Sequence, residues 1–511
     1  MRITTQYFTL TFLVFYSIRI LAFIWSYDAF GDFFIEIQNA MTWVSAPLEN
    51  ITSIMSDQVR ALYTYLIGIG LIIWNDPVST PRLISLIFAL LTFFPFLLMC
   101  REYFTSRVAY LALFLFSFFT LHIKFAAIPA DDSLFIFLIV TSVAFLFKYA
   151  SGMQIKFLIF SGISIGTASI VRPEGFLMLL LLPFLWLDTP SDAREFFDVR
   201  SHLFQATAVM LISAIMLVVT WVTFSYLMVD RFPASIFTFK TANINNLISS
   251  QNTIDKSVAI IALSTFPGIL FASLTPLVFL GALWGIMRSF KNRKYRALFI
   301  ASTLFFFLTV LFSKQSMVKN ATVYGVFLIP YAAYGFYSFH RRFLNRKAIR
   351  GILFIALASF IWIYTILVYE RGPRSHLTEK LWTISPIGYL QPEVKEIIDF
   401  FNDDAIDAQS ILIDDAEDKR IKPIMLYAMD DGRVFISATR LQNNVNPQQN
   451  AANSILEQIK TIGRAEYIVC VRESNLDQEF ETQAENPKHD QRLSVRLLLS
   501  NRYYRIYKLD N

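Results

Sequence analysis

The sequence predicts a polytopic α-helical membrane protein with about eleven membrane-spanning helices, followed by a small extracytoplasmic α/β domain. Of 511 residues, 55% are hydrophobic and only 16% are charged, whereas soluble globular proteins are about 45–50% apolar and about 25% charged. Mean hydropathy is +0.49. Long apolar runs recur up to Tyr369, after which the composition becomes polar. We therefore expect the first 370 residues to lie largely in lipid.

A membrane-spanning helix needs about twenty mostly apolar residues. The predicted spans are Tyr7–Trp25, Pro81–Met99, Val108–Phe125, Ser133–Tyr149, Lys156–Ile170, Phe176–Leu187, Leu203–Met228, Ser264–Met287, Ala297–Phe312, Ala321–Phe339 and Gly351–Tyr369. A further run, Ala61–Trp74, has only about fourteen residues, a length that suits an interfacial or re-entrant helix.

Positive charge predicts the orientation of these spans. Net charge is +6, and we attribute it to the excess of Lys and Arg in cytoplasmic loops rather than to nucleic-acid binding. If Ala61–Trp74 does not cross, the two densest basic clusters, Arg288–Arg296 and Arg341–Arg350, both lie inside. The N-terminus is then cytoplasmic, and the C-terminal domain is extracytoplasmic.

Two domains follow from this division: a transmembrane module over residues 1–370 and a soluble domain over 371–511. The module carries two long outer regions, residues 27–80 and Val229–Leu263. In the soluble domain, strand-like runs alternate with helical stretches, which indicates a small, partly parallel sheet. The runs are Ser410–Ile413, Arg433–Ile436, Glu466–Val471 and Tyr503–Lys508, and the helical stretches are Val394–Phe401 and Asn453–Ile462.

Ionisable residues at membrane depth or gathered on one face are candidate functional residues. The first outer loop contains YDAFGDFFIEIQNA, with Asp28, Asp32 and Glu36. Asp32 and Glu36 are four residues apart and would share one face of a helix. The alternative is an amphipathic helix on the membrane surface with a solvated acidic face.

A second acidic group opens the fourth span in HIKFAAIPADDSLFIF, where Asp131 and Asp132 follow His122 and Lys124. Acids at a helix N-terminus can simply cap the helix and complement its dipole. Two adjacent acids that face the acidic first loop favour a functional role as well.

Several cations lie at predicted outer turns, where few are expected. IVRPEGFL contains Arg172 and Glu174, for which a local Arg–Glu pair is the alternative. The remaining outer lysines suit an anionic group such as a phosphate; they are Lys314, Lys319 and Lys240. Arg19, within the first span, is expected to snorkel outward, although it could also line the site. Carboxylates and cations at the lipid boundary suit chemistry on a lipid-linked phosphate.

These segments resemble motifs of the GT-C class of polytopic glycosyltransferases, such as protein O-mannosyltransferases and the lipid A aminoarabinose transferase. GDFFIEI resembles their first-loop motif and places Asp32 on the catalytic aspartate, with Phe33 where a second acid often stands. VRALYTYL partly matches the next element at Arg60 and Tyr63. The later matches are ADDSLFIFL, SIGTASIVRPEGFL, DRFPASIFTFK with Lys240, and VKNATVYGVFLIPYAA with Lys319.

The resemblance implies inverting transfer of a sugar from a polyprenyl-phosphate donor to a cell-envelope acceptor, at the outer face of a bacterial cytoplasmic membrane. Asp32 would be the base, and Asp131 or Asp132 the second carboxylate. Lys319, Lys314, Arg172 or Lys240 would hold the lipid phosphate. A divalent metal near Asp131 and Asp132 is a further option. The alternatives from other classes are a flippase for a lipid-linked saccharide and a non-catalytic assembly scaffold.

Overall fold

The computed structural model divides into two compact units, each described by itself. One comprises Met1–Ser26 and Glu36–Ile387, and the other Tyr27–Ile35 and Gly388–Asn511. The described residues are 2–26, 34–45, 47, 61–152, 154–181, 207–220, 222–223, 266–290, 293–312, 317–343, 355, 357–364, 390, 392–403, 410–414, 421, 423–428, 434–437, 466–474, 476–478, 480–481 and 494–510.

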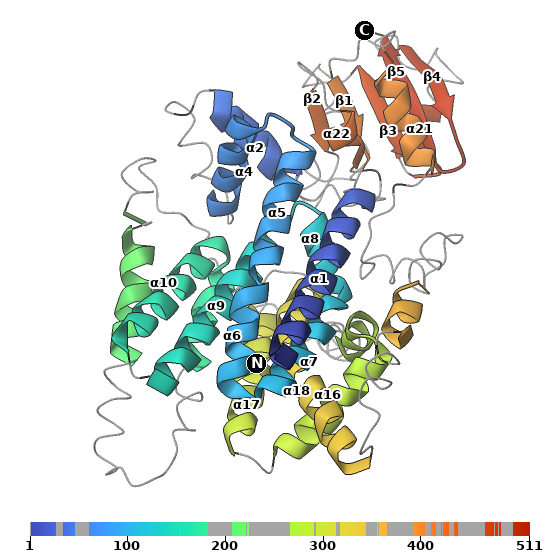
Figure 1. Ribbon diagram of the computed structural model, residues 1–511. Coiled ribbons are helices and arrows are strands. Elements are labelled where there is room, and N and C mark those ends of the chain that lie inside the picture. Colours follow the sequence, from blue (N-terminus) through green and yellow to red (C-terminus); the bar gives the residue numbers. More distant parts are fainter. Residues whose placement is uncertain are drawn as a thin grey trace, which may run out of the picture. The chain divides into compact units, whose positions relative to one another are not determined.

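The first unit is helical (Figure 1). Its elements include α1 (Arg2–Trp25), α2 (Phe34–Ser45), α4 (Ala61–Ile73), α5 (Ser79–Leu91), α6 (Phe93–Tyr103), α7 (Ser106–Ser117), α8 (Thr120–Ala127), α9 (Asp131–Gly152), α10 (Ile155–Val171), the 3₁₀ helix η1 (Pro173–Leu181), α16 (Pro276–Ser289), α17 (Arg293–Phe312) and α18 (Met317–Phe343). The first two residues of α2, Phe34 and Ile35, are assigned to the second unit.

Among the described residues, three helical segments are long and apolar enough to cross a membrane, Gln6–Trp25, Ser79–Tyr103 and Asp131–Tyr149. Two bent helix pairs raise this number to five if each pair is one span. The protein is thus a multi-pass membrane protein, and the number of about eleven spans stays a prediction. Helix α4 belongs to the shorter apolar helices.

Two predicted spans are broken, which corrects the expectation of continuous helices. The run Val108–Phe125 is interrupted between α7 and α8, which are bent by 57°. The run Ser264–Met287 is interrupted at Thr275, where the helix Phe266–Leu274 and α16 are bent by 111°. The two breaks are in contact, because the hydroxyl of Thr120 donates to the carbonyl of Ser273 at 3.0 Å.

Helices α16 and α18 cross closely because glycines line their contact. A Cβ added at Gly285 would overlap the carbonyl oxygen of Tyr331, and one at Gly335 would overlap the carbonyl oxygen of Gly281. Small residues let helix backbones approach each other in membranes. This contact fixes α18, the helix that carries Lys319.

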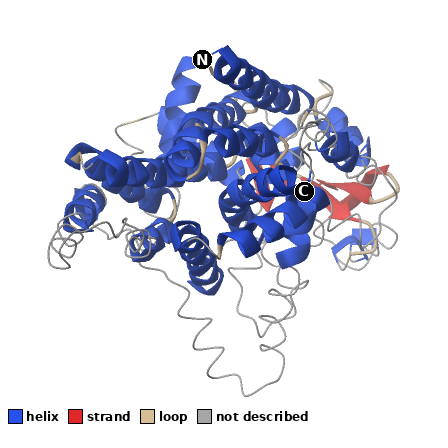
Figure 2. Cartoon of the chain, turned by 60° about the horizontal axis from the view of Figure 1, so that its bottom comes forward, coloured by secondary structure: helices blue, strands red, loops and turns tan. Residues whose placement is uncertain are grey.

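The second unit contains a five-stranded mixed sheet with the order β2-β1-β3-β5-β4; Figure 2 shows the strands confined to this one sheet. The strands are β1 (Ser410–Ile413), β2 (Val434–Ser437), β3 (Tyr467–Val471), β4 (Ser494–Ser500) and β5 (Tyr504–Asp510). Strands β2 and β3 pair parallel with β1, whereas β5 pairs antiparallel with both β3 and β4. Helices α21 (Pro392–Phe401) and α22 (Pro423–Tyr427) accompany the sheet.

The predicted small, partly parallel sheet is confirmed. Four of the five strands and α21 lie within a few residues of the predicted runs, whereas β4 was not predicted. The predicted helical stretch Asn453–Ile462 lies outside the described residues. Both cysteines, Cys100 and Cys470, are buried and free.

Candidate functional site

The site forms around the first turn of α9, where Asp131 and Asp132 begin the helix. Both carboxylates are buried, with exposures of 0% and 1%. The turn before them is held in place by Ser133, whose hydroxyl donates to the carbonyl of Phe125 at 2.8 Å. Acids at a helix N-terminus are stabilised by the helix dipole. Dipole stabilisation alone does not compensate two buried charges, which need cationic partners.

Arg172 supplies the first partner from the end of α10. The helix stops there because Pro173 follows, and Arg172 itself adopts extended backbone geometry. The chain then turns back tightly onto α10: a Cβ added at Gly175 would lie 2.6 Å from the backbone nitrogen of Ser169. The Arg-Pro-Glu-Gly sequence thus makes a compact turn that presents the Arg172 side chain to the start of α9.

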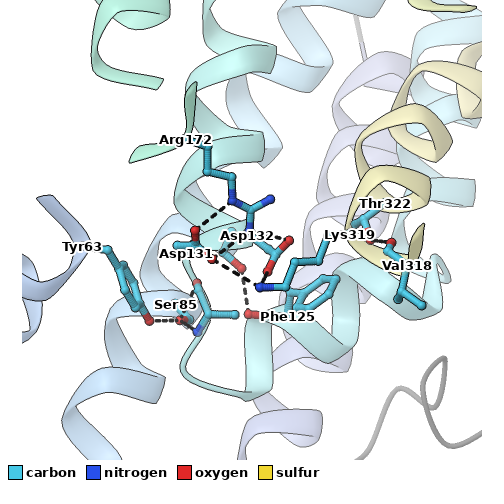
Figure 3. A network of polar contacts seen from close by, with 11 residues as sticks. Tyr63, Ser85, Phe125, Asp131, Asp132, Arg172, Val318, Lys319 and Thr322 are labelled. Carbon is cyan, nitrogen blue, oxygen red and sulfur yellow. Dashed lines mark hydrogen bonds and ion pairs between the residues drawn. The ribbon is translucent and has the colours of Figure 1, made fainter. Parts of the chain in front are cut away.

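The guanidinium of Arg172 binds both acids (Figure 3). Its Nε donates to Asp131 Oδ2 at 2.8 Å, and its Nη2 donates to Asp131 Oδ1 at 2.7 Å. The same Nη2 lies 2.7 Å from Asp132 Oδ1. Such a fork-to-carboxylate pair fixes orientation as well as charge. Arg172 is 2% exposed, so this ion pair is sealed from solvent.

Lys319, near the start of α18, is the second cation. Its Nζ lies 3.8 Å from Asp131 Oδ1 and 3.5 Å from Asp132 Oδ2, and Figure 3 shows it approaching the acids from a different side than Arg172. At 14% exposure it is less buried than the other three residues. Lys319 is therefore the cation of this group best placed to meet a ligand from outside.

The two acids differ in their surroundings. Asp131 accepts a two-point hydrogen bond from Arg172. The carboxylate oxygens of Asp132 accept no hydrogen bond from the described residues and are held by ion pairs with Arg172 and Lys319 alone. Asp132 is consequently the less constrained carboxylate of the pair.

Tyr63 on α4 and Ser85 on α5 form a hydrogen-bonded pair beside the two acids. The sequence did not predict Ser85 as a site residue. The Tyr63 hydroxyl lies 2.7 Å from Ser85 Oγ. Ser85 Oγ in turn accepts from the backbone nitrogen of Ala130, the residue before Asp131, at 2.9 Å. A serine inside an apolar run gives no signal of such a role, because helical serines commonly bond within their own helix.

Glu36 and Glu174 complete the described acidic candidates. Glu36 lies in the first turn of α2. Glu174 is buried in the turn that follows Arg172. The other candidates lie outside the described residues; they are Asp28, Asp32, Arg60, Lys240 and Lys314.

The expectation that Arg19 snorkels outward is wrong. Arg19 is fully buried, its Nε donates to His122 Nδ1 at 3.1 Å, and its Nη2 donates to the carbonyl of Phe116 at 3.1 Å. Phe116 lies in the last turn of α7, and its carbonyl also accepts from the backbone nitrogen of Phe119 at 3.2 Å. Arg19 is thus held inside the bundle by His122 and by the end of the broken helix α7.

The described residues do not fit a metal ion at the two acids. No group of three His, Cys, Asp or Glu side chains within the described ranges could hold one. The carboxylates of Asp131 and Asp132 are already paired with two cations, which a metal would have to displace.

The chain is similar to known glycosyltransferases in part of its sequence and in its fold. A family model described as dolichyl-phosphate-mannose-protein mannosyltransferase matches residues 61–221. The structure of ArnT from Cupriavidus metallidurans bound to undecaprenyl phosphate is similar with a TM-score of 0.58 and 10% identity, covering 98% of this chain and 97% of that chain. ArnT is a GT-C glycosyltransferase. The chain has the GT-C fold.

A second GT-C structure supports the same conclusion. The oligosaccharyltransferase of Archaeoglobus fulgidus, in complex with Zn and sulfate, gives a TM-score of 0.57 at 14% identity over 98% of this chain and 73% of that chain. The same enzyme tethered to an acceptor peptide gives 0.55 at 13% identity, over 92% and 69%. No curated protein matches the sequence significantly. At sequence identities of 10–14%, these structural matches show a shared fold and not a shared substrate.

Proposed function

We propose that this protein is an inverting glycosyltransferase that moves a sugar from a polyprenyl-phosphate donor to a cell-envelope acceptor: a lipid, polysaccharide or protein. The observation that carries the proposal is the buried group Asp131, Asp132, Arg172 and Lys319 in a chain with the GT-C fold. The family match includes the first three of these residues. The reaction would take place at the outer face of a bacterial cytoplasmic membrane.

The proposed reaction is a single displacement. Asp32 takes the proton from the acceptor hydroxyl or amine, which forms a bond to the anomeric carbon as the bond between that carbon and the phosphate oxygen breaks. The polyprenyl phosphate leaves with the bonding electron pair. A positioned base typically contributes about 10²–10⁴-fold to such a step.

Lys319 is the cation we assign to the departing phosphate. It is the most exposed member of the group, and an ammonium binds phosphate as a compact charge. Arg172 is engaged with both acids, so in this proposal it chiefly fixes their orientation. Lys240 and Lys314 are further candidates for the phosphate, and Asp132 for the second catalytic carboxylate.

Native mass spectrometry with added undecaprenyl phosphate tests this assignment. Lys319→Ala should lose most of the bound lipid, because the charge-assisted contact with phosphate is removed. Arg107, an exposed arginine at the start of α7, provides the control: Arg107→Ala should bind as the wild type does. Equal lipid binding by Lys319→Ala and the wild type would refute the phosphate role.

A further inference from the structure

Arg82 occupies an unusual place between three helices. It lies in the first turn of α5 and is 9% exposed. Its Nη2 donates to the carbonyl oxygens of Phe23 and Ser26, each at 2.5 Å, and its Nε donates to the carbonyl of Ala127 at 2.8 Å. No ion pair of Arg82 with a carboxylate is found within the described ranges. The carboxylate of Asp76, before α5, accepts instead from the backbone nitrogens of Val78 and Ser79, each at 2.9 Å.

The three carbonyls share one property: they stand at the C-terminal ends of helices. Phe23 and Ser26 close α1, and Ala127 closes α8. The last carbonyls of a helix have no intrahelical partner and carry the negative end of the helix dipole. One guanidinium therefore satisfies two helix ends at once, which suits its planar set of several donors.

Both helix ends lead directly to proposed catalytic acids. Ser26 is the last residue before the first outer loop, in which Asp28 and Asp32 follow. Ala127 precedes Asp131 by four residues, and the connection between them is buried throughout. Arg82 is thus bonded to the chain just before each of the two acidic segments of the site.

We infer that Arg82 is a positioning residue that fixes the origin of the first outer loop relative to Asp131 and Asp132. We call the contacts of Arg82 with the carbonyls of Phe23, Ser26 and Ala127 the clamp. The effect of the clamp on catalysis rests on the proposed function, whereas the existence of the clamp does not. Holding α1 and α8 on one guanidinium sets the point from which the loop starts. A displacement of about 1 Å at a reacting group can cost about 10²-fold in rate.

The substitution Arg82→Lys probes the clamp with little change in charge. A lysine ammonium is a compact donor group on a flexible stem and cannot reproduce the rigid fork. Arg82→Gln, which keeps a planar donor and removes the charge, is the second variant in case the first does not fold. Arg107→Lys, at the exposed arginine of α7, is the matched control.

Hydrogen–deuterium exchange measures the clamp directly. The last turns of α1 and α8 contain the amides of Ser26, bonded to Ala22 O at 2.9 Å, and of Ile128, bonded to Lys124 O at 3.2 Å. Arg82→Lys should raise exchange in peptides that cover these two turns and leave α16 and α18 unchanged. Unchanged exchange at both turns, or a rise throughout the protein, would overturn the inference.

Transfer kinetics measure the consequence. In the same preparations, kcat for sugar transfer should fall about 10²-fold in Arg82→Lys, while undecaprenyl phosphate binding stays at the level of the wild type and of Arg107→Lys. A wild-type kcat in a variant with raised exchange would overturn the positioning role. A wild-type protein without any transfer activity would instead count against the proposed function, and the exchange result would still decide whether the clamp exists.

Discussion

At the scale of single residues, the two adjacent aspartates are not equivalent. Asp131 is bound at two points by Arg172, whereas Asp132 is held by ion pairs alone. The sequence identifies both acids as candidates because they are ionisable residues at membrane depth. It identifies Arg172 and Lys319 because they are cations at predicted outer turns, where few are expected. It does not reveal that Arg172 pairs with Asp131, 41 residues away, and with its neighbour Asp132. A contact between distant segments has no local pattern, and Glu174 offers a nearer partner in the sequence.

The difference between the acids predicts different effects of the same substitution. Asp131→Asn should lower the melting temperature markedly, because removing one member of a buried ion pair typically costs about 3–5 kcal/mol. Asp132→Asn should leave the melting temperature closer to that of the wild type and reduce transfer activity more than stability. Thermal unfolding in detergent and transfer assays on the same samples provide the measurement. Equal melting temperatures for the two variants would contradict the distinction.

At the scale of helices and strands, the sequence predicts apolar runs but not where they break. Hydropathy continues through the end of α7 and through Thr275, so the apolar pattern gives no sign of the bends of 57° and 111°. Pro276 marks the start of α16, because proline favours the first turn of a helix and restricts the residue before it, but it does not predict the angle. Strand β4 was missed for a related reason: SVRLLLS does not alternate strictly, and its pairing with β5 contains an irregularity between Leu497 and Leu499. The breaks matter for the site, because α8 leads into the start of α9.

The crossing of α16 and α18 gives a prediction at this scale. Gly335→Ala should destabilise the protein, because the added Cβ would overlap the carbonyl of Gly281, and the backbones would have to separate. Gly268→Ala is the control, since a Cβ there meets no atom within 4 Å. Comparison of melting temperatures tests this. A Gly335→Ala variant as stable as Gly268→Ala would show that the helices do not pack as described.

At the scale of the whole molecule, composition alone predicts the division into a lipid-embedded module and a polar domain. Orientation in the membrane rests on the basic clusters and remains a prediction. Single-cysteine accessibility tests it in a background without Cys100 and Cys470. We expect Lys291→Cys to react only from the cytoplasmic side and Gln448→Cys only from outside. Labelling of Lys291→Cys from outside would invert the arrangement and separate the site from the outer face.

The transferase proposal as a whole depends on Asp32, which the GT-C resemblance places as the base. The most direct measurement is transfer of radiolabelled sugar from endogenous lipid donor in membranes that contain the protein, with release of polyprenyl phosphate followed in parallel. The wild type should transfer sugar and release the lipid phosphate. Asp32→Asn, which keeps size and hydrogen-bonding capacity but cannot take the proton, should lose about 10²–10⁴-fold in rate and still bind undecaprenyl phosphate. Full transfer by Asp32→Asn, or movement of lipid-linked sugar across the bilayer without transfer by the wild type, would contradict the account.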